Sequence, residues 1–158
     1  MELVLQPQKN KVVFISHRGN TKGPDPSKEN SPDYVLDATR KGDPVEIDVW
    51  FKGNNFFLGH SSPMFQVPLD FLKNTMFLCH AKNIEALQVL NKNSIHCFWH
   101  IEDDFTLTSQ NKIIVHEKNQ DKISFINNPN LIIVNLGKYP DLTIGSHAVC
   151  SDFSPENL

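Results

Sequence analysis

The stretch Val12-Val13-Phe14-Ile15-Ser16-His17-Arg18-Gly19 joins four apolar residues to a polar, titratable end that closes on a glycine. The apolar part does not alternate with polar residues, which is typical of a strand covered on both faces, as in parallel sheets. Seven further apolar runs follow along the chain: Val45 to Phe51, Phe56-Phe57-Leu58, Met76 to Cys79, His96 to His100, Ile113-Ile114-Val115, Leu131 to Val134 and Ala148 to Cys150. The sequence therefore predicts eight strands.

Two segments between these runs have the features of helices. The first, Pro32 to Lys41, follows Ser31 as its N-cap, has a proline at the first helical position and ends at Gly42. The second, Asn83 to Asn91, repeats apolar side chains on one face. In contrast, Gly53-Asn54-Asn55 predicts a tight turn between two neighbouring strands. The remaining connections are too short or too polar for full helices.

Eight strands with at least two intervening helices predict an α/β fold, a compact (β/α)8 TIM-type barrel with several helices shortened or missing. Such barrels usually have about 250 residues, so a chain of 158 residues would be a small example. An open α/β sheet is the alternative. We expect one domain over residues 1–158, with residues 1–10 as an N-terminal extension, because no linker divides the chain.

The composition narrows the class of partners. A net charge of −3 argues against a surface that coats nucleic acid, although a local basic pocket remains compatible with it. No apolar run is long enough to span a bilayer, and the first residues lack the features of a secretion signal. Cys79, Cys97 and Cys150 lie in apolar contexts without paired spacing, so we expect buried thiols in a reducing, cytoplasmic setting.

Polar residues gather where the predicted strands end, and parallel strands bring these ends to one rim. They are His17 and Arg18, Glu46 and Asp48, His60, His80 and Lys82, His100 with Glu102 and Asp103, His116, Asn135 and Asp152. Glu46 and Asp48 are two residues apart on one strand, so their carboxylates share a face and repel each other. A divalent cation, Mg²⁺ or Ca²⁺, would relieve that repulsion. A solvated strand face is the alternative interpretation.

His17 and His60 form a candidate acid–base pair, because histidine titrates close to neutral pH and each of the two lies near a glycine at a strand end. Arg18 offers a fork of donors for phosphate oxygens, and Lys82 offers a point charge. Together with the two carboxylates, these groups are the ones needed to hold a metal, neutralise a phosphate and move protons.

Four segments resemble motifs of the glycerophosphodiester phosphodiesterase family, which has a His-Arg-Gly strand end, a Pro-Glu-Asn-Thr loop, a Glu-x-Asp-Val strand and a His-Asp turn. The counterparts are His17-Arg18-Gly19, Lys28-Glu29-Asn30-Ser31, Glu46-Ile47-Asp48-Val49 and His60-Ser61. A later Glu-x-Lys motif of the family corresponds to His80-Ala81-Lys82. The match covers residues 12–61, with weaker support to about residue 83.

The resemblance implies a metal-dependent phosphodiester hydrolase of lipid metabolism that acts on a small phosphodiester; no protein partner is inferred. It implies Mg²⁺ or Ca²⁺ on Glu46, Asp48 and His80. It also implies acid–base catalysis by His17 and His60 at the carboxyl-terminal rim of the barrel. Arg18 and Lys82 would bind the phosphate, and Glu29 and Asn30 would support the site. His100 lies in a stretch, Phe98 to Asp104, that has no counterpart in the family pattern, and its position at a strand end makes it a further supporting candidate.

Three departures from the family pattern leave other functions open. His80 replaces a carboxylate, and its softer nitrogen favours a transition metal. Ser61 replaces an aspartate, and only twenty residues separate His60 from His80, where the family has a substantial insertion. The alternatives are a lyase that forms a cyclic phosphate and a catalytically inactive barrel that binds phosphate or metal.

Overall fold

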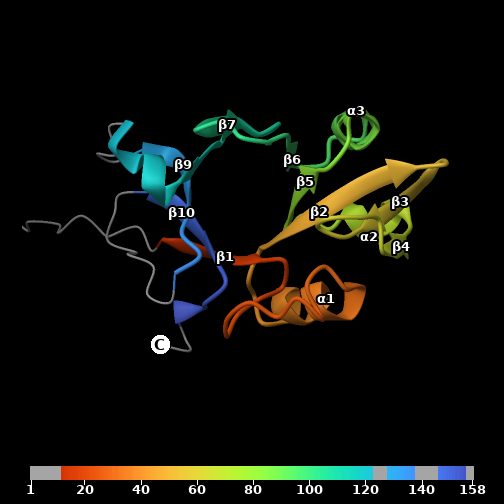
Figure 1. The fold of residues 1–158 in the computed structure, drawn as a ribbon, viewed down its shortest axis with the longest axis horizontal. Helices are drawn as coiled ribbons and strands as arrows, with labels where there is room; N and C mark the ends of the chain where they lie inside the picture. Colours follow the sequence, from red (N-terminus) through yellow and green to blue (C-terminus); the bar gives the residue numbers. More distant parts are fainter. Residues whose placement is uncertain (1–11, 123–127, 138–145, 156–158) are drawn as a thin grey trace, which may run out of the picture.

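The computed structural model describes residues 12–122, 128–137 and 146–155, and one curled mixed sheet dominates this part of the chain (Figure 1). Its strands are β1 (Val13–His17), β2 (Val45–Lys52), β3 (Asn55–Leu58), β4 (Phe65–Val67), β5 (Phe77–Ala81), β6 (Cys97–Phe98), β7 (Phe105–Leu107), β8 (Ile113–His116), β9 (Asn128–Val134) and β10 (Ser146–Ser151). The helices are α1 (Pro32–Arg40), α2 (Leu69–Leu72), α3 (Ile84–Lys92) and the 3₁₀ helix η1 (Glu117–Lys122). The predicted extension at residues 1–10 lies outside the described residues.

The sheet is parallel at its centre and antiparallel where hairpins join it. Strands β8, β9, β10, β1 and β2 are neighbours in that order and run parallel, and β5 and β6 continue the parallel set from β2. Strands β3 and β4 form an antiparallel hairpin extension on β2, and β7 pairs antiparallel with β8. The sheet thus curls into a half-barrel whose parallel strands end on the same side.

The prediction of a (β/α)8 TIM-type barrel is wrong. The described residues contain more strand than helix, with three α-helices, and no ladder joins β6 to β7 among them. The physical reason is the length of the connections: β6 and β7 are separated by residues 99–104, and β7 and β8 by residues 108–112. Such links hold no helix of useful length, and a short hairpin link forces the antiparallel direction of β7. The outer helical ring therefore cannot form.

The predictions of individual strands, helices and turns agree with the structure better than the predicted fold class does. Each of the eight predicted runs contains a strand, and both predicted helices form within a residue or two of their expected ends. The Gly53-Asn54-Asn55 turn joins β2 to β3, with positive φ at Gly53 (56°) and Asn54 (61°), as a tight hairpin turn requires. Strands β4 and β7 were not predicted, because each is only three residues long and neither has a continuous apolar run.

Apolar packing occurs on both sides of the sheet. One buried cluster lies between the sheet and helices α1 and α3, and it includes Cys79 and Cys97. A second cluster lies on the inner face of the half-barrel and includes Cys150. All three cysteines are buried and free, as predicted. No helix among the described residues is long and apolar enough to cross a membrane.

The end of β3 is fixed by a contact that leaves no room for a side chain at Gly59. Its φ is +150°, and an added Cβ would collide with the main-chain oxygen of Ser62. The Gly59 carbonyl accepts a 2.7 Å hydrogen bond from Trp50 Nε1, and the Gly59 N–H donates to the Asp48 carbonyl at 3.2 Å. Gly59 thereby places the following residue, His60, beside β2.

We expect Gly59→Ala to lower the free energy of unfolding by more than about 3 kcal/mol, because it adds a main-chain collision to an unfavourable φ. Urea denaturation measures the loss. Gly42→Ala is the matched control: Gly42 also has a positive φ (+94°), but open space surrounds the site of its Cβ. That control should lose only about 1–2 kcal/mol. Equal losses in the two variants would contradict the collision.

Candidate functional site

The carboxyl-terminal ends of β1, β2 and β5 bring the predicted residues to one rim. In the sheet register His17 is opposite Glu46, and Asp48 is opposite His80. The side chains of His17, Glu46 and His80 border a cavity of about 450 Å³. Of the predicted site residues, the cavity is lined by His17, Arg18, Glu46, His60, His80, Lys82 and His100. The other three, Asp48, Glu29 and Asn30, lie behind this lining and hold it in place.

Asp48 is fully buried and contacts residues from three other segments. Its Oδ2 forms an ion pair with Arg18 Nε at 2.9 Å and accepts a hydrogen bond from Asn30 Nδ2 at 2.9 Å. Its Oδ1 lies 3.3 Å from His80 Nδ1 and 3.5 Å from Lys82 Nζ. Burial disfavours the charged carboxylate, but a hydrogen bond from His80 in its protonated form and the charge of Arg18 outweigh it and hold the pKa of Asp48 well below its usual range.

Glu46 has fewer partners than Asp48. Its Oε1 lies 3.7 Å from His80 Nδ1, and its Oε2 lies 3.8 Å from His17 Nε2. Burial, reinforced by the charge of Asp48, raises the pKa of Glu46. Among the described residues, neither Glu46 Oε2 nor Asp48 Oδ1 finds a hydrogen-bond partner, although both atoms are buried. Buried carboxylate oxygens without a hydrogen bond are rare in folded proteins, and two of them lie in this one site, although Asp48 Oδ1 has ion-pair contacts with His80 and Lys82.

The orientation of His80 turns a ring nitrogen towards these two carboxylates. Its Nε2 lies 3.0 Å from the carbonyl oxygen of His100, which only accepts hydrogen bonds, so Nε2 carries a proton. The ring also stacks on Phe98, with centroids 4.6 Å apart, which fixes its plane. In the neutral ring Nδ1 then presents a lone pair to Glu46 and Asp48. One ligand atom from each of the three side chains lies within 4.8 Å of the other two.

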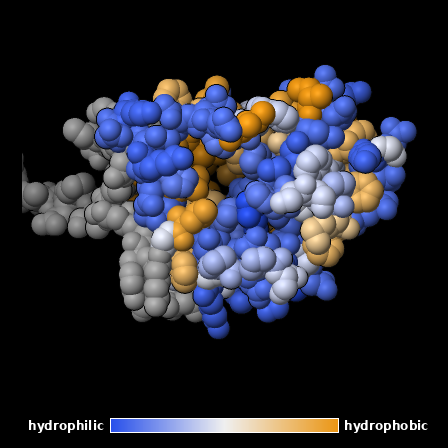
Figure 2. Space-filling model, in the orientation of Figure 1, coloured by the Kyte–Doolittle hydropathy of each residue, from blue (hydrophilic) through white to orange (hydrophobic). Residues whose placement is uncertain are grey.

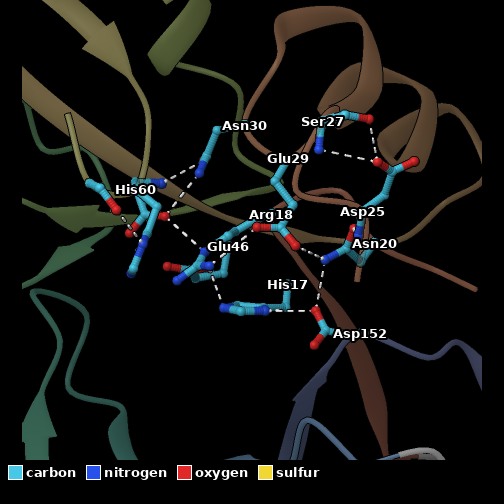
Figure 3. A network of polar contacts seen from close by, with 12 residues as sticks. His17, Arg18, Asn20, Asp25, Ser27, Glu29, Asn30, Glu46, His60 and Asp152 are labelled. Carbon is cyan, nitrogen blue, oxygen red and sulfur yellow. Dashed lines mark hydrogen bonds and ion pairs between the residues drawn. The ribbon is translucent and has the colours of Figure 1, made fainter. Parts of the chain in front are cut away.

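His17 is oriented by a residue that the sequence did not assign to the site. Its Nδ1 lies 2.7 Å from Asp152 Oδ1, just beyond β10, which leaves Nε2 facing Glu46 and the cavity (Figure 3). Burial opposes protonation, but the Asp152 hydrogen bond and the Glu46 charge outweigh it and raise the pKa of His17. The position of Asp152 at the end of the last predicted strand was the available signal.

A polar network behind the cavity connects Arg18 to Asp152. Arg18 Nη1 donates to Glu29 Oε2 at 3.2 Å, and Asn20 Nδ2 lies 2.8 Å from both Glu29 Oε1 and Asp152 Oδ1 (Figure 3). Arg18 has a φ of +57°, a conformation uncommon for a residue with a side chain and more frequent at functional sites. Asn30, at φ +63°, completes the support by accepting the Asp48 N–H at 2.9 Å.

His60 occupies the exposed side of the cavity. Its Nδ1 lies 3.2 Å from Ser61 Oγ, and its ring reaches the same cavity as His17 (Figure 3). Burial and the charge of Arg18 lower the pKa of His60. His100 contributes its carbonyl oxygen to His80, while its own buried Nδ1 has no hydrogen-bond partner in the part of the chain that the structure describes. The predicted histidines therefore surround one space.

Comparisons with known proteins add nothing to this geometry: no family model matches the chain, and neither a curated protein nor a solved structure does. The resemblance of residues 12–83 to the glycerophosphodiester phosphodiesterase family therefore stays a prediction. What the site offers chemically rests on its own contacts: a set of N and O ligand atoms, two cations and two histidines that line one cavity.

We expect Asp152→Asn to lower the pKa of His17. The substitution removes the carboxylate that stabilises the protonated ring, while burial continues to favour the neutral ring. Titration of the histidine ring protons by NMR measures the shift. Asp70→Asn is the matched control, because Asp70 is exposed and its ion pair within the described residues is with Lys73, at 2.7 Å. An unchanged His17 titration in Asp152→Asn would contradict the assigned hydrogen bond.

Proposed function

We propose that this protein is a metal-dependent phosphodiester hydrolase that acts on a small phosphodiester. The observation that carries the proposal is the convergence of Glu46, Asp48 and His80 on one point beside a cavity. Two cations, Arg18 and Lys82, lie in the same lining. The motif resemblance supports the same reaction class. The free, buried cysteines fit a reducing compartment, so the proposal includes a cytoplasmic location.

A divalent cation fits the residues present. Without one, Nδ1 of a neutral His80 turns its lone pair towards Oε1 of Glu46 and Oδ1 of Asp48, and the Asp48 oxygen has no hydrogen-bond partner among the described residues. The donation of His80 Nε2–H to a main-chain carbonyl is the usual second contact of a metal-binding histidine. Carboxylates suit Mg²⁺ or Ca²⁺, and the added nitrogen favours Mn²⁺ or Zn²⁺. When bound, the ion would stabilise negative charge on the phosphate oxygens.

The chain's own residues can then perform the proton transfers and hold the substrate. Because Asp152 occupies Nδ1 of His17, the Nε2 atom of that ring exchanges a proton with the attacking hydroxyl or with the leaving alcohol. His60 takes the opposite part from the exposed side of the cavity. Lys82 and the guanidinium of Arg18 attract the phosphate and complement the charge that grows on it during the reaction.

One observation limits the part that Arg18 can play in binding the phosphate. The Nε and Nη1 atoms of Arg18 are already within 3.2 Å of Asp48 and Glu29, so fewer of its donors are free for phosphate than in an open guanidinium. The lyase alternative uses the same residues, and its product distinguishes it: a cyclic phosphate accumulates where a hydrolase releases a linear one.

We expect metal-stripped protein to hydrolyse bis(p-nitrophenyl) phosphate after Mg²⁺, Ca²⁺, Mn²⁺ or Zn²⁺ is restored. His17→Ala and His60→Ala should each lower kcat by about 10²- to 10⁴-fold, the usual contribution of a general acid or base. Release of p-nitrophenol gives the rate, and phosphorus NMR with a substrate that has a neighbouring hydroxyl identifies a linear or a cyclic product.

The matched control is His96→Gln. His96 is a half-buried histidine whose Nε2 lies 2.8 Å from Thr108 Oγ1, away from the cavity lining. This variant should keep the wild-type rate. Full turnover in both His17→Ala and His60→Ala would contradict the acid–base assignment. Folded wild-type protein that binds a phosphodiester but turns over none with any of the four metals would contradict hydrolysis and select the binding-only alternative.

A further inference from the structure

The cavity has two chemically different walls. On one side are the titratable groups at the ends of β1, β2 and β5. On the other side are apolar side chains of β8, β9 and β10, namely Ile114, Ile132, Val134 and Cys150. Figure 2 shows a hollow near the centre of the face, with hydrophobic residues towards β9 and β10 and hydrophilic residues towards β1 and β2. The proposed hydrolase uses only the titratable wall.

The sheet register makes the second wall continuous. Ile114 is paired with Ile132, and Val134 is paired with Cys150. Side chains two residues apart on a strand share a face, so Ile132 and Val134 face the same side of β9. Leu78 and Phe98 extend this apolar lining from β5 and β6. The result is one apolar surface in the same cavity as the metal-ligand group, which it meets where Phe98 stacks on His80.

This surface discriminates between the alcohols that a phosphodiester can carry. The side chains of Ile114, Ile132 and Val134 have no hydrogen-bonding group, and the Cys150 thiol is only a weak donor. The polar side chains on this side of the cavity are Thr106 of β7 and His116 at the end of β8. The hydroxyls of a glycerol or a sugar placed against the apolar side chains would lose their water without gaining a partner. An alkyl or aryl group would instead gain from leaving water. Ile101 also lines the cavity and is 67% exposed, so apolar surface continues to its mouth.

We propose that the substrate is an amphiphilic phosphodiester, with its phosphate on the charged wall and an alkyl or aryl substituent against β8, β9 and β10. The inference rests on the proposed function, because the phosphate is placed by the residues of that site. A cavity of about 450 Å³ lies within the range that encloses small organic ligands. The inferred substrate therefore differs from a glycerophosphodiester in the substituent on its phosphate, which is an apolar alkyl or aryl group and not a polar glycerol.

The first test measures binding without turnover. Methyl, butyl and octyl esters of methylphosphonic acid carry one negative charge, as a phosphodiester does, and differ only in chain length. Calorimetric titration of the wild-type protein, with Mn²⁺ present, should show affinity rising by about fourfold per methylene until the cavity is filled, which is about 0.8 kcal/mol for each group. Equal affinity for the methyl and octyl esters would overturn the proposal.

Val134→Thr tests the wall itself. The substitution keeps the side-chain shape and adds a hydroxyl that an alkyl ligand cannot satisfy, at a half-buried position that should tolerate it. We expect octyl methylphosphonate to bind about fivefold more weakly or worse, while the methyl ester binds as before. The control is Val13→Thr, a 36%-exposed position outside the cavity lining. Equal effects of the two substitutions on the octyl ester would overturn the placement.

Turnover separates this inference from the proposed function. Hydrolysis of bis(p-nitrophenyl) phosphate without any dependence of alkyl ester binding on chain length would overturn the substrate class and leave the hydrolase standing. Chain-length-dependent binding without turnover would support the apolar wall and contradict hydrolysis.

A further comparison distinguishes the two possible sources of the substrate, a lipid in a membrane and a soluble ester. Octyl p-nitrophenyl phosphate is offered either as a monomer or within phosphatidylcholine vesicles. Faster turnover in vesicles identifies a lipid headgroup, faster turnover of the monomer identifies a soluble ester, and either result supports the class.

Discussion

The buried carboxylate of Asp48 is the constraint on which the rest of the site depends. It is fully buried in β2, and its two oxygens contact Arg18 and Asn30 on one side and His80 and Lys82 on the other. A buried charge is strongly unfavourable unless it is paired and hydrogen-bonded. The ends of β1 and β5 and the loop before α1 must therefore lie close to β2. One carboxylate thus fixes four elements relative to one another and places the cavity between them.

The site also contains polar atoms that the fold alone does not require. A stabilising network would satisfy Glu46 Oε2 and Asp48 Oδ1, yet both lack a hydrogen-bond partner among the described residues. Arg18, a residue with a bulky side chain, adopts a left-handed backbone conformation at the same rim. Buried polar atoms without partners and uncommon backbone conformations lower stability, and they are expected at functional sites, where the chemistry requires them. This concentration at one rim is why we assign function there rather than elsewhere.

The sequence predicts the local structure better than the global one. Continuous apolar runs such as Val45 to Phe51 identify strands, because parallel strands covered on both faces have that composition. The capping pattern at Ser31 and Pro32 identifies the start of α1 for an equally local reason. Closure of the barrel is a different problem. A closed barrel requires β6 to pair with β7. The only sign in the sequence against this pairing is the length of the link, residues 99–104, which is too short to hold a helix. The apolar runs therefore do not distinguish a half-barrel from a closed barrel.

The same division holds within the candidate site. Glu46 and Asp48 were assigned together because the two-residue period of a strand places them on one face, and the structure shows them on one rim. Asp152 and Asn20 were not assigned, since their roles arise from contacts across more than 130 residues of chain. Asn20 lies in a loop with no periodic pattern, so only the folded structure shows that it joins Glu29 to Asp152.

The central claim is that Glu46, Asp48 and His80 together hold a divalent cation. Anomalous diffraction from crystals grown with Mn²⁺ tests it most directly, because the ion is located independently of any activity. The account predicts a single strong peak about 2.0–2.4 Å from a carboxylate oxygen of Glu46, from Asp48 Oδ1 and from His80 Nδ1. A strong peak elsewhere with none between these three atoms, or no peak at millimolar Mn²⁺, would contradict it.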